Sequence, residues 1–364
     1  MLSIVLFSAS VAFAADDGNI TASQVNDEIS TDNEVLTIDE GSCELESDNG
    51  GILQDNGSIS DSNVVTNDTF YNYFDEDGVL TSNATELIFE GDFSNIGVYC
   101  ITIAKSVTFT GRNATFNNIA FIIKENNVVI DGFNLNMNSD MYLVNVKNVD
   151  DVTISNNVIN FLSLKSMDSF AILAKNITTL NLLKNTITYV GTTEGANINN
   201  AVRVEGGRNV TMSDNVYNII MPSVDVKYDL NYNLEAFSEG IVFLTCENVT
   251  LTRNNIKLNY SGISGSSDTI YVVTIGNANM NYTDFTFPNV CKNVVVSDNN
   301  ITANGHGYIY SMSIVADEFE LTNNNFDITA EANYANAIAV GGPSSNGKVS
   351  GNVIEITAPN VVYG

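Results

Sequence analysis

The sequence predicts an all-β protein, a right-handed parallel β-helix of about nine coils, from three observations. One phrase recurs along the C-terminal three quarters of the chain; residues 152–161 read Val-Thr-Ile-Ser-Asn-Asn-Val-Ile-Asn-Phe, and residues 210–219 repeat the pattern. Each copy joins two short alternating apolar segments at an asparagine, and copies follow at intervals typical of a solenoid. No stretch shows a sustained helical period with caps, whereas strand-length, β-branched segments between turn residues are common.

Aligned copies of the phrase place one residue type at the same corner of successive coils. The first copy has Phe133 there, after Gly132. A stacked amide can donate and accept hydrogen bonds along the stack, and asparagine tolerates the left-handed backbone of a tight corner. We therefore predict an asparagine ladder formed by Asn157, Asn185, Asn215, Asn254, Asn299, Asn324 and Asn352.

The N-terminal region precedes the repeats and differs from them in composition. Residues 1–14 hold an apolar run and a small-x-small cleavage site, which predicts a signal peptide and a secreted or cell-surface protein. Residues 15–69 are acidic and poor in large apolar side chains, as expected of a disordered linker. The β-helix is predicted over residues 70–364, where the chain stops in mid-repeat as a truncated fragment would.

The charge balance excludes several kinds of partner. With 14 basic and 43 acidic residues, the net charge is −29, which opposes binding to nucleic acid or to an anionic membrane. No apolar run is long enough to insert into a bilayer. Acidity can attract Ca²⁺, and the Asp75 to Gly78 segment suggests a carboxylate loop, but it lacks the remaining ligands of an EF-hand. We expect no resident metal or cofactor, and this segment to cap the first coil.

Two intervals between copies, of 39 and 45 residues, exceed the 24 to 30 residues of the others. The extra residues predict loop insertions near 222–240 and 261–288, on adjacent coils and on one face. Their aromatic and acidic side chains suit sugar rings and hydroxyls, although they would equally pin the loops to the coil wall. The predicted binding residues are Tyr228, Tyr232, Asp225, Asp229, Tyr271, Tyr282, Asp268 and Asp284.

Four cysteines are compatible with an oxidising compartment. Cys246 and Cys291 each lie three residues before the valine that opens a phrase, so they should stack on neighbouring coils. Two alternatives remain open, a disulfide or two buried thiols in matching core positions. Eleven Asn-x-Ser/Thr sequons favour export, and the glycosylation candidates are Asn83, Asn113, Asn259 and Asn281.

The segment from Phe70 to Leu80, with 87–91 and 127–133, resembles the start of the adhesin-like surface proteins of methanogenic archaea. The resemblance covers residues 66–364 and implies a pectate-lyase-like β-helix in an extracellular glycoprotein with a proposed role in attachment. Immunoglobulin-like repeats and a wall-binding module, which often follow in that family, are absent from this sequence, so the manner of anchoring is in doubt.

Two short motifs raise the alternative of an enzyme. Gly305-His306-Gly307 resembles the Gly-His-Gly of polygalacturonases, but no aspartate pair on the preceding coils accompanies it, so a histidine in a turn is expected. A lyase would need a basic residue beside carboxylates, and Arg203, which shares a strand face with Glu205, is the best candidate. The alternative without a catalytic role is that these two residues form a surface ion pair.

The sequence as a whole favours a non-catalytic, adhesin-like β-helix that binds a cell-surface glycan or protein. A β-helix polysaccharide lyase or glycoside hydrolase is the second hypothesis, and a structural component of the envelope is the third. The exposed edge of the last coil also predicts end-to-end self-association.

Overall fold

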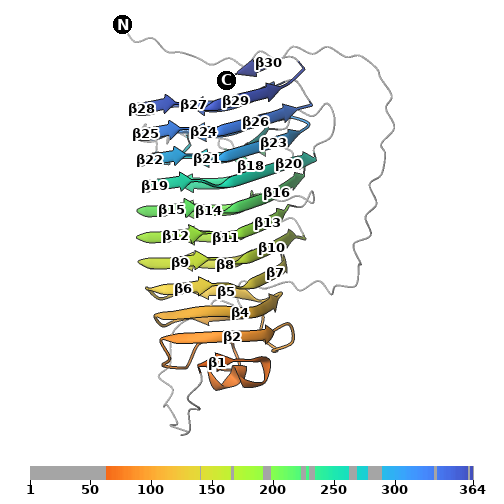
Figure 1. The fold of residues 1–364 in the computed structure, drawn as a ribbon, viewed down its shortest axis with the longest axis vertical. Helices are drawn as coiled ribbons and strands as arrows, with labels where there is room; N and C mark the ends of the chain where they lie inside the picture. The colour runs from red at the N-terminus through yellow and green to blue at the C-terminus, as the bar shows by residue number, and fades with distance from the viewer. Residues whose placement is uncertain are drawn as a thin grey trace, which may run out of the picture. The chain divides into compact units, whose positions relative to one another are not determined.

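The computed structural model describes residues 63–139, 141–164, 168–191, 198–222, 227–228, 234–261, 269–277, 289–331, 334–359 and 361–363. These residues form a parallel β-helix, which confirms the predicted fold class. Strands stack in sequence order from β1 to β30, and nearly every pairing is parallel (Figure 1). The right-handed sense of the coil stays a prediction, based on the usual hand of parallel crossovers.

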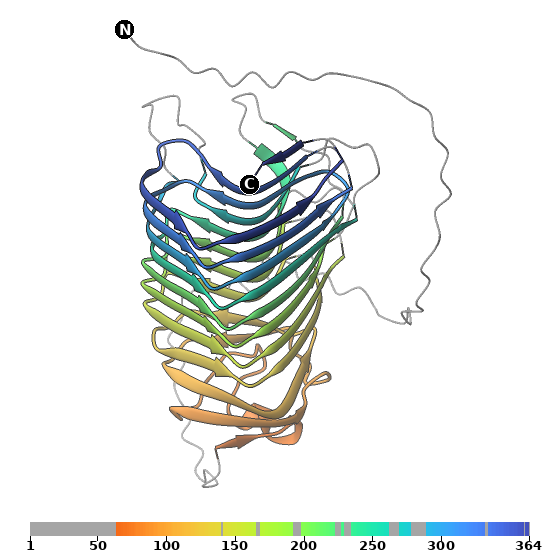
Figure 2. The ribbon, with the colours of Figure 1, turned by 45° about the horizontal axis from the view of Figure 1, so that its top comes forward.

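Each coil contributes strands to two sheets, one of 19 strands and one of 11, here called the large and small sheets. The large sheet has two legs that meet at a corner, so each coil bends into a V when viewed along the stack (Figure 2). Ten strands of the small sheet follow one another in series, one per coil, against about nine coils predicted.

The strands fall into three columns. The first leg holds β6 (Val128–Asp131), β9 (Asp151–Ser155), β12 (Thr179–Leu183), β15 (Asn209–Ser213), β19 (Glu247–Thr252), β22 (Cys291–Ser297), β25 (Ala316–Thr322) and β28 (Ser345–Ser350). The second leg holds β7 (Asn134–Ser139), β10 (Val158–Ser163), β13 (Thr186–Val190), β16 (Val216–Pro222), β20 (Asn255–Ser261), β23 (Asn300–Gly305), β26 (Asn325–Ala330) and β29 (Val353–Thr357). The small sheet holds β3 (Cys100–Ile103), β5 (Ala120–Ile123), β8 (Tyr142–Lys147), β11 (Ser169–Lys175), β14 (Ile198–Glu205), β18 (Leu234–Leu244), β21 (Thr269–Ile275), β24 (Tyr308–Ile314), β27 (Tyr334–Val340) and β30 (Val361–Tyr363).

The first coils differ from the later ones. The described fold begins with β1 (Val64–Val65) and the 3₁₀ helix η1 (Asn67–Asn72), ahead of the predicted start at residue 70. Strands β2 (Glu86–Asp92) and β4 (Val107–Asn117) pair with each other along their length, and β4 reaches both β6 and β7. Phe70 and Phe74 at the η1 end stack at 4.4 Å between ring centroids and cover the apolar interior.

The interior of the first coils is filled mainly by phenylalanine, and that of later coils by aliphatic side chains. Phe93 and Phe116 stack at 4.5 Å, and Phe89 and Phe133 meet edge to face at 5.5 Å. All four are buried, so offset and edge-on ring packing adds to the burial of apolar area.

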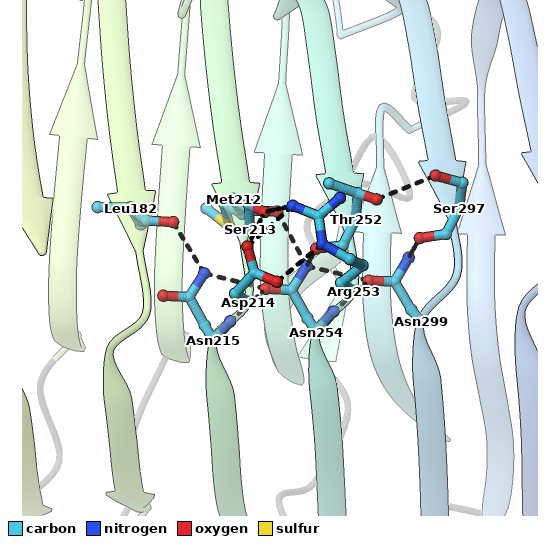
Figure 3. A network of polar contacts seen from close by, with 10 residues as sticks. All are labelled: Leu182, Met212, Ser213, Asp214, Asn215, Thr252, Arg253, Asn254, Ser297 and Asn299. Carbon is cyan, nitrogen blue, oxygen red and sulfur yellow. Dashed lines mark hydrogen bonds and ion pairs between the residues drawn. The ribbon is translucent and has the colours of Figure 1, made fainter. Parts of the chain in front are cut away.

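The seven predicted asparagines lie at the corner of the large sheet, and all but Asn352 are buried. Figure 3 shows three of them, Asn215, Asn254 and Asn299, with their hydrogen bonds. Each carboxamide oxygen accepts the backbone N–H of the ladder residue one coil earlier, beginning with Phe133, whose N–H donates to Asn157 at 2.9 Å. Each carboxamide nitrogen donates to a backbone carbonyl of the preceding coil, as Asn185 does to Ile154 at 2.8 Å.

The left-handed backbone at this corner is not where the sequence analysis placed it. The residue with positive φ is the one before each ladder asparagine, for example Asn156 (φ 55°), Lys184 (φ 55°) and Arg253 (φ 54°). The ladder asparagine itself is absent from the positive-φ residues. At the first corner Gly132 (φ 81°) takes this conformation.

The predicted insertions are shorter than the sequence suggested. Residues 234–240 belong to β18, and residues 269–275 form β21, which pairs in register with β18 and β24. The prediction that 261–288 is one continuous loop is therefore wrong, since a strand of the small sheet divides it. Lys227 and Tyr228 form β17, which pairs antiparallel with the start of β18.

Cys246 and Cys291 stack on neighbouring coils and are both buried. Both alternatives, two thiols or a disulfide formed in an oxidising compartment, stay predictions for these stacked positions. Among the described residues, no helix is long and apolar enough to cross a bilayer.

Candidate functional site

Most of the predicted binding residues lie outside the described residues: Tyr232, Asp225, Asp229, Tyr282, Asp268 and Asp284. Tyr228 lies in β17, where only the backbone is described. Tyr271 is in β21, at the centre of a row of tyrosines and charged residues that follows the outer face of the small sheet.

The tyrosine row is formed by Tyr271, Tyr310 and Tyr334 on β21, β24 and β27. Tyr271 pairs in register with Tyr310, and their rings stack at 5.0 Å with 22° between planes. The rings of Tyr310 and Tyr334 lie 5.5 Å apart. Tyr308 and Tyr363 flank Tyr334, at 5.7 and 5.3 Å. Parallel register brings Tyr271 against Tyr310, because equivalent side chains of successive coils lie one above another. Tyr334 pairs in register with Tyr308, so it meets Tyr310 diagonally.

The three central tyrosines are half-buried, so part of each ring is accessible to a ligand. Burial, with the neighbouring hydroxyl of Tyr334, raises the pKa of Tyr310 above its usual range, so its hydroxyl stays protonated and can donate a hydrogen bond. Sequence reasoning missed Tyr308, Tyr310 and Tyr334. A fixed offset from the corner would not have found them, because Tyr271 lies 17 residues after Asn254 and Tyr310 lies 11 residues after Asn299.

A charged cluster lies on the same outer face, on β11 and β14. Arg203 Nε donates to Glu205, and Lys175 Nζ lies 3.0 Å from the other oxygen of Glu205. The shared face that the sequence predicted for Arg203 and Glu205 is present. Arg203 is only 8% exposed, however, so it is not part of a surface ion pair, which was the simpler expectation. The charges of Arg203 and Lys175 and their hydrogen bonds outweigh the opposing effect of partial burial and lower the pKa of Glu205.

The cluster extends to a buried carboxyl group on β18. Glu239 is 5% exposed and accepts a hydrogen bond from Thr274 Oγ1 at 2.7 Å. Asn200 joins it to Arg203, since its side chain donates to the Glu239 carbonyl at 2.8 Å and accepts from Arg203 at 3.3 Å. Burial raises the pKa of Glu239 to about 7, against the opposing effects of the Thr274 hydrogen bond and Arg203. Burial also raises the pKa of Asp168.

The charged cluster and the tyrosine row are continuous. Glu239 pairs in register with Tyr271, and Tyr271 with Tyr310. A strip of polar and aromatic side chains therefore crosses six neighbouring strands, β11, β14, β18, β21, β24 and β27, along the stacking direction. We call this strip the small-sheet strip; it comprises Lys175, Arg203, Glu205, Glu239, Tyr271, Tyr310 and Tyr334.

His306 lies in the turn between β23 and β24, as expected of a turn histidine. Its Nε2 is 2.6 Å from a carboxylate oxygen of Glu331, and both side chains are partly exposed. The Asp75 carboxylate accepts the backbone N–H groups of Asp77 and Val79, at 3.1 and 2.8 Å, and so closes a turn in the first coil. No group of metal-ligating side chains occurs among the described residues.

Three of the four glycosylation candidates are described, and all three are exposed: Asn83, Asn113 and Asn259. Asn83 accepts a hydrogen bond from Lys105 Nζ at 2.9 Å. Asn113 has φ 54° and lies in the irregular middle of β4. The fourth candidate, Asn281, is outside the described residues.

Comparison with known proteins places this chain in no family. No family model matches the sequence, and no curated protein matches it. Among solved structures, the catalytic domain of a GH87 α-1,3-glucanase in complex with nigerose is similar over 74% of this chain, with 14% identity and a TM-score of 0.19. This chain spans 58% of that domain.

A variant of a GH87 catalytic domain in complex with tetrasaccharides gives 12% identity and a TM-score of 0.18, over 84% of this chain and 71% of that one. Both similarities are distant, and neither protein's activity is transferred to this chain.

Proposed function

We propose that this protein is a secreted or cell-surface, adhesin-like β-helix that binds a glycan on the small-sheet strip. The observation that carries the proposal is the half-buried tyrosine row, joined in register to Glu239 and, through Asn200, to Arg203. The extracellular location rests on the predicted signal peptide and on the sequons.

The chemistry of the strip suits a sugar polymer. Ring faces and edges pack against the apolar faces of sugar rings, and phenol, amide and carboxylate groups bond to hydroxyls. The rings repeat along the stacking direction, so a chain-like ligand can contact successive tyrosines. A net charge of −29 opposes nucleic acids, whereas it does not penalise a neutral glycan.

The test is binding of residues 15–364 to a broad glycan and polysaccharide array, followed by affinity measurements on any ligand found. Tyr310→Ala should weaken binding at least tenfold, because it removes the central ring of the row. Tyr99→Ala is the matched control, since Tyr99 is exposed but lies in the first coils, away from the strip. Equal affinity of the two variants, or no glycan bound by the parent protein, would contradict the proposal.

A second candidate function, a polysaccharide-cleaving enzyme, is favoured by the basic residues among carboxylates on adjacent coils. Lys175 and Arg203 lie beside Glu205, and Glu239 has a pKa near neutrality, which suits a group that exchanges protons. Against it, Glu239 and Arg203 are almost fully buried, so a substrate reaches them only if the covering residues move.

Incubation with a panel of polysaccharides, with detection of new reducing ends and of unsaturated products, tests the enzyme. Release of oligosaccharides by the parent protein, reduced at least a hundredfold in Glu239→Gln, would establish it. Tight glycan binding without any cleavage product would support the binding function and contradict the enzyme.

A further inference from the structure

The outer face of the second leg carries no charge over four adjacent coils. Its outward residues are the first, third and fifth of β7, β10, β13 and β16, as the alternation of exposure along these strands shows. They are five asparagines, five aliphatic residues and two threonines. In a chain of net charge −29, twelve neighbouring outward positions without a carboxylate or a cation form a distinct surface. We call it the neutral face.

The neutral face is regular and partly apolar. Its strands pair in continuous parallel register, without a bulge between β7 and β16. Val158, Leu162 and Ile220 are 40, 37 and 40% exposed, although they lie in the middle of the stack and not at its ends. Sheet surfaces that carry aliphatic side chains can pack face to face against a matching surface.

Opposite charges lie just beyond the two edges of this face. Lys257, in β20, follows Asn218 in the third-residue row and is exposed. At the other edge the first-residue row runs from Asn134 through Thr115 to Asp92, which is exposed at the end of β2. One cation and one carboxylate therefore border the face, with β10 midway between their strands.

We propose that the neutral face is a self-association surface, on which a second copy of this chain docks. The two copies are related by a two-fold axis that runs along β10 between the two faces, so their stacking directions are antiparallel. The axis superposes the β20 edge of one copy on the β2 edge of the other, so Lys257 approaches Asp92 of the partner subunit, twice. Such an isologous interface uses one patch on both copies, as most homodimers do.

Charge and area favour a second copy as the occupant. Two strongly acidic molecules repel each other, and the neutral face is where they approach at the lowest electrostatic cost. From β2 to β20 the face measures about 29 Å along the stack, at about 4.8 Å per strand, so two copies bury about 1,000 Å². That is the lower limit for a specific interface, and the dimer is therefore weak and forms at high local concentration.

Sedimentation equilibrium of residues 15–364, from about 10 μM to 1 mM, tests the proposal. The protein carries Asn259→Gln, so that no glycan is attached at the edge of the face. A monomer–dimer equilibrium is expected, and Thr188→Glu, at the centre of the face, should raise its dissociation constant at least tenfold. Thr211→Glu is the matched control, since Thr211 is an outward, half-buried threonine of the first leg, and it should leave the constant unchanged.

Charge reversal tests the antiparallel arrangement. Lys257→Glu and Asp92→Lys should each weaken the dimer severalfold, and the double variant should restore it. A protein that stays monomeric at 1 mM would overturn the proposal, as would equal effects of the two threonine variants. Loss of association in Ile354→Glu alone would show end-to-end stacking, and loss of glycan binding in Thr188→Glu without any dimer would make the face a glycan surface.

Discussion

The side-chain oxygen of Asn254 accepts two hydrogen bonds from Asn215, one from its backbone N–H at 3.0 Å and one from its carboxamide at 2.9 Å. The carboxamide nitrogen of Asn254 in turn donates to carbonyls of Met212 and Thr252 and to Asn299. One buried amide thus satisfies groups on three successive coils, and the ladder ties each corner to the next.

Asn254→Ala should therefore destabilise the protein by about 3 to 5 kcal/mol, since several buried donors and acceptors lose their partner together. Chemical unfolding of residues 15–364 measures the effect. The matched control is Asn255→Ala, because Asn255 is the next residue, points outward, and its side chain accepts one hydrogen bond, from the exposed Asn300 at 3.3 Å. We expect less than about 0.5 kcal/mol from the control. Similar losses in the two variants would contradict the role of the ladder.

The left-handed backbone of the residue before each ladder asparagine leads to a second prediction. Lys184 adopts φ 55°, which costs an L-residue about 1 to 2 kcal/mol that glycine does not incur. Lys184→Gly should stabilise the protein by about 1 kcal/mol, after the entropic cost of glycine in the unfolded chain. Lys257→Gly, in the middle of β20, should instead destabilise it by about 0.5 to 1 kcal/mol. Thermal unfolding of both variants checks the difference in sign.

The raised pKa of Glu239 predicts how stability depends on pH. The folded state holds a proton on Glu239 up to about pH 7, whereas the unfolded chain releases it near pH 4.5. The contribution of Glu239 to the free energy of unfolding is therefore constant below pH 4.5 and falls by about 3 kcal/mol as the pH rises to 7. Above pH 7 it is constant again. Glu239→Gln should remove this loss and be more stable than the parent protein at pH 8, with little difference at pH 4.

Glu205→Gln is the control of opposite sign, because the pKa of Glu205 is lowered in the folded state. The carboxylate of Glu205 stabilises the protein above its unfolded pKa, and this contribution is lost as the pH falls. Glu205→Gln should therefore be less stable than the parent protein at pH 8, with the difference shrinking in acid. Urea unfolding from pH 4 to 8 measures both variants, and parallel behaviour would contradict the assignment.

The stacked thiols give a chemical prediction. The contact with Cys291 and burial raise the pKa of the Cys246 thiol above its usual range, which suppresses the reactive thiolate. Cys246 and Cys291 should resist an alkylating reagent in the native protein and react fully in urea. Peptide mapping by mass spectrometry reads out each cysteine separately, and a cross-linked pair of peptides from the secreted protein would show the disulfide instead.

The sequence alone predicted the β-helix and the corner because both depend on local pattern. Alternating apolar residues assign the inward face of each leg, and a buried asparagine at six successive corners leaves the phrase visible at Asn157, Asn215 and Asn299. The conformation of Lys184 and Arg253 was not predictable in this way, since neither residue type favours a positive φ.

The candidate site was harder to predict, because it depends on register between distant segments. Tyr271 and Tyr310 are separated by 39 residues and meet only through the pairing of β21 with β24. Residues 269–275 read as part of a long insertion because residues 262–268 and 278–288 lengthen the interval between corners. The burial of Arg203 beside Asn200 likewise follows from tertiary packing that no local pattern records.

The Asn254–Asn299 step spans 45 residues and the Asn299–Asn324 step only 25, yet both make the same hydrogen bonds. The hydrogen bonds at the corner therefore do not depend on the number of residues between two ladder asparagines. Foreign peptides inserted between β20 and β21 should be displayed without altering the scaffold, and in evolution such segments are free to lengthen and diversify. The fold therefore combines a constant β-helix scaffold with segments that can vary, as antibody domains combine a constant scaffold with variable loops.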